Sequence, residues 1–201
     1  MTNDIPRRKD GGIKFSFRPS TEEELKACLS DPLWRICSGA LYKIIIKGDE
    51  KAKDENKKHD LVTEFKPNRA QKRLIASLWH RNVILKARQL GFTTLVCIIW
   101  LDTALFSENV RCGIIAQDRE AAEAIFRDKV KFAYQNLPEL LRLRMPLARD
   151  SASELLFAHN NSSIRVATSM RSGTIHRLHV SEFGKICAKY PDKAVEVITG
   201  S

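Results

Sequence analysis

The chain has 201 residues, of which 43% are hydrophobic and 29% charged, and its formal net charge is +10. This length predicts one domain with a small appendage, and the composition is that of a folded globular chain rather than a disordered tail. The longest apolar run, Leu95 to Leu101, falls short of the ~20 residues of a membrane span. The basic start also lacks the apolar core of a secretion signal, so we expect a cytoplasmic protein without a membrane partner.

The net charge and the cysteine pattern limit which partners and cofactors are expected. An excess of basic residues favours a polyanionic partner such as nucleic acid, although an ordinary solvated basic surface explains it equally well. The five cysteines are scattered and form no CxxC pair, so we expect reduced thiols and no zinc site.

Residues 1–60 are predicted to form a lead-in ahead of the main domain. The first residues are polar and basic, and we expect a loose tail there. Ser20 to Glu24 has the hydroxyl cap and early acids of a helix start. Asp31-Pro32 begins a second short helix that runs into Ile44 to Ile46. Residues 48–60 are almost wholly charged, which is typical of a hairpin loop or a linker.

Residues 61–201 alternate between helical and strand patterns. Helices are expected over Arg69–Trp79, Thr93–Phe106, a long segment capped by Asp118 that runs to Gln135, and a segment opened by Pro191. Strands are expected over Asn82–Ala87, Val110–Ala116, a hairpin of Leu155–Ala158 and Ile164–Thr168, and Ile175–Val180. Such alternation with apolar strands predicts an α/β fold in which helices cover both faces of a mainly parallel sheet.

The segment KARQLGFTT, residues 86–94, lies between a predicted strand and a predicted helix, as a phosphate-binding loop does. Compared with GxxxxGK[ST], Gly91 and Thr93 match the second glycine and the magnesium-binding hydroxyl. Lys86 stands in the place of the first glycine, and Phe92 in the place of the lysine. The pattern itself therefore fails, and an ordinary strand–turn–helix explains the spacing equally well.

Despite that mismatch, the segment still has the chemical groups that bind phosphate. Backbone N–H groups and the helix N-terminus still face the loop, and Lys86 and Arg88 can supply cations to phosphates. A nucleoside triphosphate site is therefore one of two interpretations of this segment.

Two further segments favour the nucleotide interpretation. Residues 178–182 form a strand that ends in an acid, as a Walker B strand does, where Glu182 would polarise water and Ser181 would help to hold magnesium. Residues 65–71 precede the loop, and the amide of Gln71 has the hydrogen-bonding groups to read adenine. Taken singly, an acid after a strand is usually structural, and a solvent-exposed helix glutamine is the commoner role for Gln71.

Together these segments resemble the large terminase subunit of tailed bacteriophages and prophages, the ATP-driven motor that packages DNA. The resemblance covers roughly residues 30–201, and Arg-Gln-Leu-Gly followed by Thr-Thr is its most specific part. Some members carry the phosphate lysine at the start of the loop, as Lys86 is here, with an aromatic residue in its usual place.

The resemblance implies an ATP-binding P-loop NTPase of the ASCE (RecA-like) type with magnesium as cofactor. The residues implied to bind ATP are Gln71, Lys86, Arg88, Gln89, Gly91, Thr93 and Thr94. Thr93 and Ser181 would hold magnesium, and Glu182 would activate water. Arg171 would act as an arginine finger, although a surface or DNA-facing charge explains it too, and Thr199-Gly200-Ser201 would couple hydrolysis to movement.

The resemblance further implies double-stranded DNA, the small terminase subunit and the portal protein as partners, in a homo-oligomeric ring within a bacterial host cell. Family members continue into a nuclease domain, and we expect this chain to be an incomplete ATPase domain, residues 61–201, without that activity. A helicase-like ATPase and a catalytically inactive prophage remnant remain alternatives.

Overall fold

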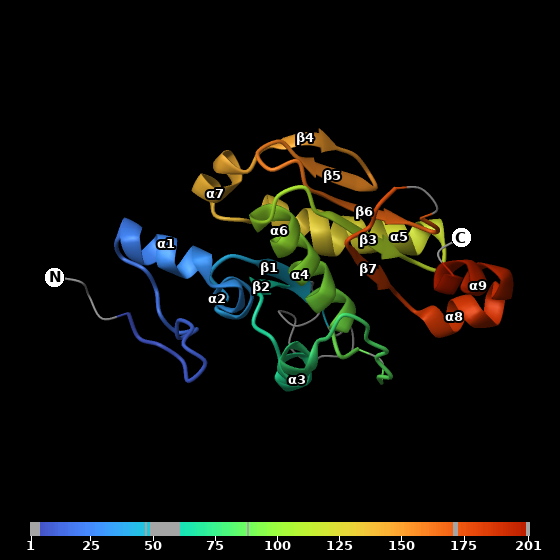
Figure 1. Ribbon diagram of the computed structural model, residues 1–201, viewed down its shortest axis with the longest axis horizontal. Helices are drawn as coiled ribbons and strands as arrows, with labels where there is room; N and C mark the ends of the chain where they lie inside the picture. The colour runs from blue at the N-terminus through green and yellow to red at the C-terminus, as the bar shows by residue number, and fades with distance from the viewer. Residues whose placement is uncertain (1–4, 47, 49–60, 88, 171–172, 200–201) are drawn as a thin grey trace. The chain divides into compact units, whose positions relative to one another are not determined.

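The computed structural model describes residues 5–46, 48, 61–87, 89–170 and 173–199 (Figure 1). The chain divides into two compact units, residues 1–95 and 96–201, and the division falls inside helix α4 (Phe92–Phe106). The boundary expected after residue 60 stays a prediction. Within the described residues, no helix combines the length and the apolarity needed to cross a lipid bilayer.

The first unit begins with two capped helices, as the sequence predicts. Helix α1 (Glu22–Ser30) starts at Thr21, whose side chain accepts from the N–H of Glu24. The Glu24 carboxylate accepts from the Thr21 N–H in return, which completes a capping box. Helix α2 (Pro32–Cys37) is capped by Asp31, and its proline occupies the first turn, where a missing N–H costs nothing.

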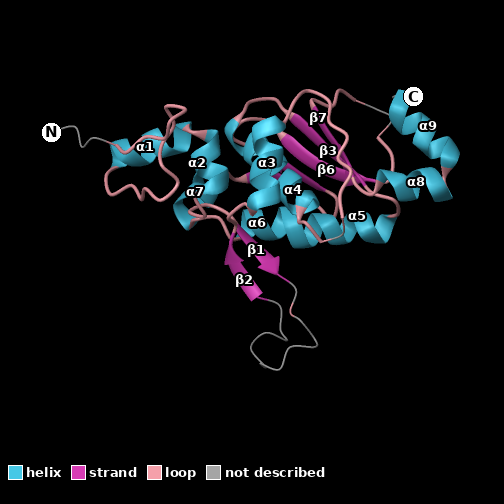
Figure 2. Cartoon of the chain, turned by 90° about the horizontal axis from the view of Figure 1, so that it is seen from below, coloured by secondary structure: helices cyan, strands magenta, loops and turns pink. Residues whose placement is uncertain are grey.

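An antiparallel pair and a third helix complete the described part of this unit. Strand β1 (Lys43–Ile46) pairs with β2 (Leu61–Glu64), and Figure 2 shows the two side by side. Helix α3 (Arg69–Ser77) follows, two residues shorter than expected. Trp34, Tyr42 and Phe65 are each about 1% exposed and form the largest buried side chains of the unit.

The prediction of a strand over Asn82–Ala87 is wrong. The structure has no strand there, and the side chains of Val83 and Leu85 are both 102% exposed. Apolar residues give a segment the propensity for a strand, but a strand exists only where a neighbouring backbone supplies hydrogen bonds. The loop ahead of α4 is therefore not preceded by a sheet strand within the described residues.

The second unit holds the main sheet and most of the helices. Its strands are β3 (Arg111–Ile115), β4 (Leu147–Asp150), β5 (Glu154–Phe157), β6 (Ser163–Ala167) and β7 (Arg177–Val180). Its helices beyond α4 are α5 (Arg119–Ile125), a π-helical segment (Phe126–Lys131), α6 (Phe132–Gln135), α7 (Glu139–Arg144), α8 (Phe183–Lys189) and α9 (Pro191–Thr199). The sequence prediction missed β4, α7 and α8, while the run capped by Asp118 extends to Gln135 as expected.

The sheet is mixed, which corrects the expectation of a mainly parallel one. Its order is β4-β5-β6-β3-β7, so that β4 and β7 are its two edges (Figure 1). Strand β3 runs parallel to both β6 and β7, whereas β4, β5 and β6 pair antiparallel. The antiparallel half of the sheet has a local cause. Strand β4 joins the predicted β5–β6 hairpin through a short turn, and short turns impose antiparallel pairing. The fold is a mixed α/β arrangement.

Candidate functional site

The turn that opens α4 has two residues in the left-handed region, Gln89 with φ 64° and Gly91 with φ 71°. The carbonyl oxygen of Gly91 accepts from the N–H of Leu95 at 3.0 Å, which is the first hydrogen bond of the helix. A Cβ atom at position 91 would lie 2.9 Å from Nε2 of Gln71. The left-handed backbone favours glycine here, and any larger residue would also displace the amide of Gln71.

The N-terminus of α3 holds this turn. Asn68 and Gln71 form a capping box, with each side chain accepting from the other residue's N–H. Nε2 of Gln71 donates to the carbonyl oxygen of Gly91 at 2.8 Å, and Nδ2 of Asn68 donates to that of Leu90 at 3.3 Å. Two side chains of one helix start thus contact two consecutive carbonyls of the loop.

These bonds bear on the predicted adenine contact of Gln71. The sequence singles out Gln71 as a candidate, but this residue is only 5% exposed, and both polar atoms of its side chain already have protein partners. A contact with adenine would have to compete with those bonds. The role of Gln71 in reading adenine stays a prediction.

The other residues predicted to bind phosphate lie along the same loop. Lys86 and Gln89 are exposed, and Thr93 and Thr94 are half-buried in the first turn of α4. The first-turn N–H groups of a helix lack intrahelical partners and carry partial positive charge, which suits an anion. Arg88 lies outside the described residues.

The acidic half of the predicted site follows β7. Ser181 is 4% exposed, and its N–H donates to the carbonyl oxygen of Ile115 at 2.8 Å. Glu182 comes next with φ 55°, and its side chain remains 45% exposed. An oxygen of its carboxylate lies 3.4 Å from Nζ of Lys185. Left-handed backbone is uncommon for a glutamate, and such strain clusters at functional positions.

Magnesium can be considered from the donors present. Within the described ranges, no group of three or more His, Cys, Asp or Glu side chains is placed to hold a metal. A nucleotide-bound Mg²⁺ does not need such a cage, because phosphates and water supply most of its ligands. The half-buried Thr93 hydroxyl fits that mode, whereas the hydroxyl of Ser181 belongs to a residue that is almost fully buried.

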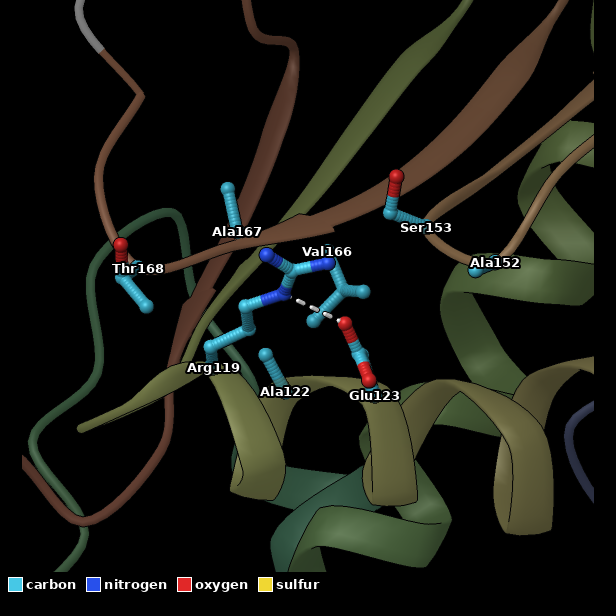
Figure 3. Close-up of a pocket in the computed structure, with 8 residues that line it drawn as sticks. All are labelled: Arg119, Ala122, Glu123, Ala152, Ser153, Val166, Ala167 and Thr168. Atoms are coloured by element: carbon cyan, nitrogen blue, oxygen red, sulfur yellow. Dashed lines mark hydrogen bonds and ion pairs between the residues drawn. The ribbon is translucent and has the colours of Figure 1, made fainter.

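A cavity of about 260 Å³, which no sequence pattern predicts, lies near the carboxyl end of β6 (Figure 3). Arg119 and Glu123 of α5 lie over it and pair with each other at 2.7 Å. The residues that line it are Arg119, Ala122, Glu123, Ala152, Ser153, Val166, Ala167 and Thr168. Crevices at the carboxyl ends of parallel strands are common ligand sites, but here the two charged groups satisfy one another.

Of the remaining predicted residues, the structure describes only Thr199. Thr199 ends α9, and its hydroxyl donates to the carbonyl oxygen of Val195 at 3.0 Å. Gly200, Ser201 and Arg171 lie outside the described residues. The coupling and finger roles of these residues stay predictions.

No protein-family model matches the chain, and no curated protein matches it. Its function is therefore inferred from its own residues. The phosphate-loop residues, Gln71 to Thr94, belong to the first unit, and the acidic residues, Ser181 and Glu182, belong to the second.

Proposed function

We propose that this chain is an ATPase domain of the phage terminase large-subunit type, which hydrolyses ATP to move double-stranded DNA. The observation that carries the proposal is the loop ahead of α4. A left-handed glycine there opens a 15-residue helix, and a buried amide from α3 anchors it. Threonine hydroxyls follow in the first helical turn, and Lys86 precedes the loop. This combination of residues suits a phosphate chain.

The proposed roles follow from what each side chain can do. Lys86 would neutralise phosphate charge, and the Thr93 hydroxyl would donate an oxygen ligand to Mg²⁺. Mg²⁺, when bound with ATP, neutralises charge that builds on the transferred phosphoryl group. Glu182 would accept a proton from the attacking water, since its exposed carboxylate is accessible at the end of β7. The fold in this proposal is a P-loop NTPase of the ASCE type.

The charge distribution supports a DNA partner. From Phe65 to Leu101 the chain has no acidic residue. The same stretch contains seven basic residues, and the six that the structure describes are exposed: Lys66, Arg69, Lys72, Arg73, Arg81 and Lys86. Clustered exposed cations are the electrostatic signature of polyanion binding. The small terminase subunit, the portal protein, a homo-oligomeric ring and a bacterial cytoplasm belong to the same proposal.

A direct test is titration of the 201-residue chain with a fluorescent ATP analogue and Mg²⁺, followed by turnover assays with and without duplex DNA. We expect saturable nucleotide binding and hydrolysis that duplex DNA stimulates. Absence of binding would contradict the ATPase proposal and favour an inactive remnant. Unwinding of duplex DNA would favour the helicase-like alternative, whereas motion along intact duplex would favour the terminase type.

A further inference from the structure

The side chain of Gln71 is poorly placed to recognise a ligand, but well placed to hold the loop. It is 5% exposed, its Oε1 accepts from the N–H of Asn68 at 2.8 Å, and its Nε2 donates to the carbonyl oxygen of Gly91 at 2.8 Å. A buried amide that is satisfied at both ends is costly to move, because each broken bond leaves a desolvated polar group.

The carbonyl oxygen of Gly91 is the junction between loop and helix. It accepts from Nε2 of Gln71 and, at 3.0 Å, from the N–H of Leu95. Those two bonds fix the plane of the peptide that joins Gly91 to Phe92, the first residue of α4. The second contact, from Asn68 to the carbonyl oxygen of Leu90, holds the preceding peptide. Two successive peptides are therefore oriented from α3.

We propose that Gln71 is a positioning residue, which sets the shape of the Gly91 turn and thereby aims the first amides of α4 at a triphosphate. This inference rests on the proposed nucleotide site and deepens it. Under this inference, Gln71 influences how tightly the phosphate chain binds. Its contribution to affinity is therefore the same whether or not the ligand carries a base. Adenine recognition by Gln71 predicts the opposite, namely an effect that disappears when the base is removed.

The test uses neutral substitutions in the full chain, so that no added charge repels the ligand. Gln71→Met keeps the length of the side chain and removes both hydrogen bonds. Asn68→Ser keeps a good helix cap and removes only the contact to Leu90. Gln135→Met is the matched control, because this glutamine is exposed at the end of α6.

The first readout is hydrogen exchange without nucleotide. We expect exchange of the amides of residues 89–95 to rise on the order of 10-fold in Gln71→Met. Asn68→Ser should raise it less, the control should leave it unchanged, and the amides of β3 and β6 should not change in any variant. Unchanged exchange over residues 89–95 in Gln71→Met would overturn the positioning role.

The second readout is affinity for Mg-ATP, Mg-GTP and inorganic tripolyphosphate. Positioning predicts that Gln71→Met weakens all three by the same factor, to within about threefold, because the lost contacts act on the loop alone. Loss of affinity for ATP with tripolyphosphate unaffected would overturn positioning and establish adenine recognition. If the unmodified chain binds none of the three ligands, the proposed nucleotide site is wrong, and the positioning role falls with it. Hydrogen exchange would then still report whether Gln71 holds the turn.

Discussion

The backbone N–H of Ser181 donates to the carbonyl oxygen of Ile115 at 2.8 Å, one step beyond the last paired residues of β3 and β7, Ile115 and Val180. Ser181 is the first residue after β7 and is buried, and Glu182 follows it with an exposed side chain. Its left-handed backbone then turns the chain into α8. The carboxylate of Glu182 thus lies just beyond the carboxyl end of β7, where α8 begins.

We expect Glu182→Gln to keep Mg-ATP affinity within about twofold and to lower turnover by about 10²–10⁴-fold, because an amide fills the same space without accepting a proton. Single-turnover hydrolysis measures the loss. Glu120→Gln, an exposed glutamate in the first turn of α5, is the control and should keep full activity. Equal turnover in Glu182→Gln and the unmodified chain would remove Glu182 from the mechanism.

The phosphate lysine is expected to be Lys86 rather than a residue in the position of Phe92. Lys86→Ala should weaken binding of an ATP analogue by on the order of 10-fold or more, since a charge-assisted contact to phosphate is lost. Phe92→Ala should lower the melting temperature and leave affinity nearly unchanged. A titration that ranks the two variants in the reverse order would contradict this assignment.

Asp31 is expected to make the stability of the first unit depend on pH. Burial raises its pKa, but hydrogen bonds from the N–H of Ile13 and from Arg8 outweigh burial, so the pKa lies below its ordinary 3.8. A lowered pKa in the folded state stabilises the protein above the unfolded value, and this contribution is lost as pH falls through the folded value.

Chemical denaturation between pH 7 and pH 2 should therefore show a steep loss of stability below about pH 4. Asp31→Asn should flatten that loss and cost about 1.5–3 kcal/mol at pH 7, because its amide nitrogen would face the donors of Ile13 and Arg8. Asp10→Asn is the comparison, since Asp10 also pairs with Arg8 but is exposed. If stability falls with pH in Asp31→Asn in parallel with the unmodified chain, this carboxylate is not the source of the acid-dependent loss of stability.

Asn160 is predicted to be a stability determinant of the second unit. Its Nδ2 donates to the carbonyl oxygens of Ala104 and Ser107 at 2.8 Å each, so it satisfies the C-terminal end of α4. Asn160→Ala should lower the free energy of unfolding by about 1–3 kcal/mol, because those carbonyls lose a donor. Gln135→Ala, an exposed amide, should change it by less than about 0.5 kcal/mol in the same urea titration.

The thiols offer a rapid check of the core. Cys187 is exposed, while burial raises the pKa of Cys97 and Cys112 to about 12 and that of Cys28 and Cys37 to about 11. Since the thiolate is the reactive form, a thiol reagent at neutral pH should label one thiol quickly and the others only after unfolding. Cys187→Ser should abolish the fast phase, and labelling of several thiols in the native chain would contradict the described core.

Local signals in the sequence were sufficient for most helix starts. The capping box of Thr21 and Glu24, the Asp31-Pro32 start and the cap at Asp118 all form as predicted. Each depends on contacts within a few residues of the chain, so the residue types alone specify them. The hairpin of β5 and β6 forms for the same reason, because its turn residues lie between its two strands.

Tertiary structure alone decided the pairings over long distances in sequence. Apolar residues 82–87 have strand propensity, yet Val83 and Leu85 remain exposed, because propensity supplies no neighbouring strand. The sequence could single out Gln71 only as a candidate, because its bond to Gly91 spans 20 residues and depends on how the turn meets α3. Sequence thus determined where most of the helices begin, whereas the hydrogen-bonding partners of the strands and turns depend on which backbone groups folding brings together.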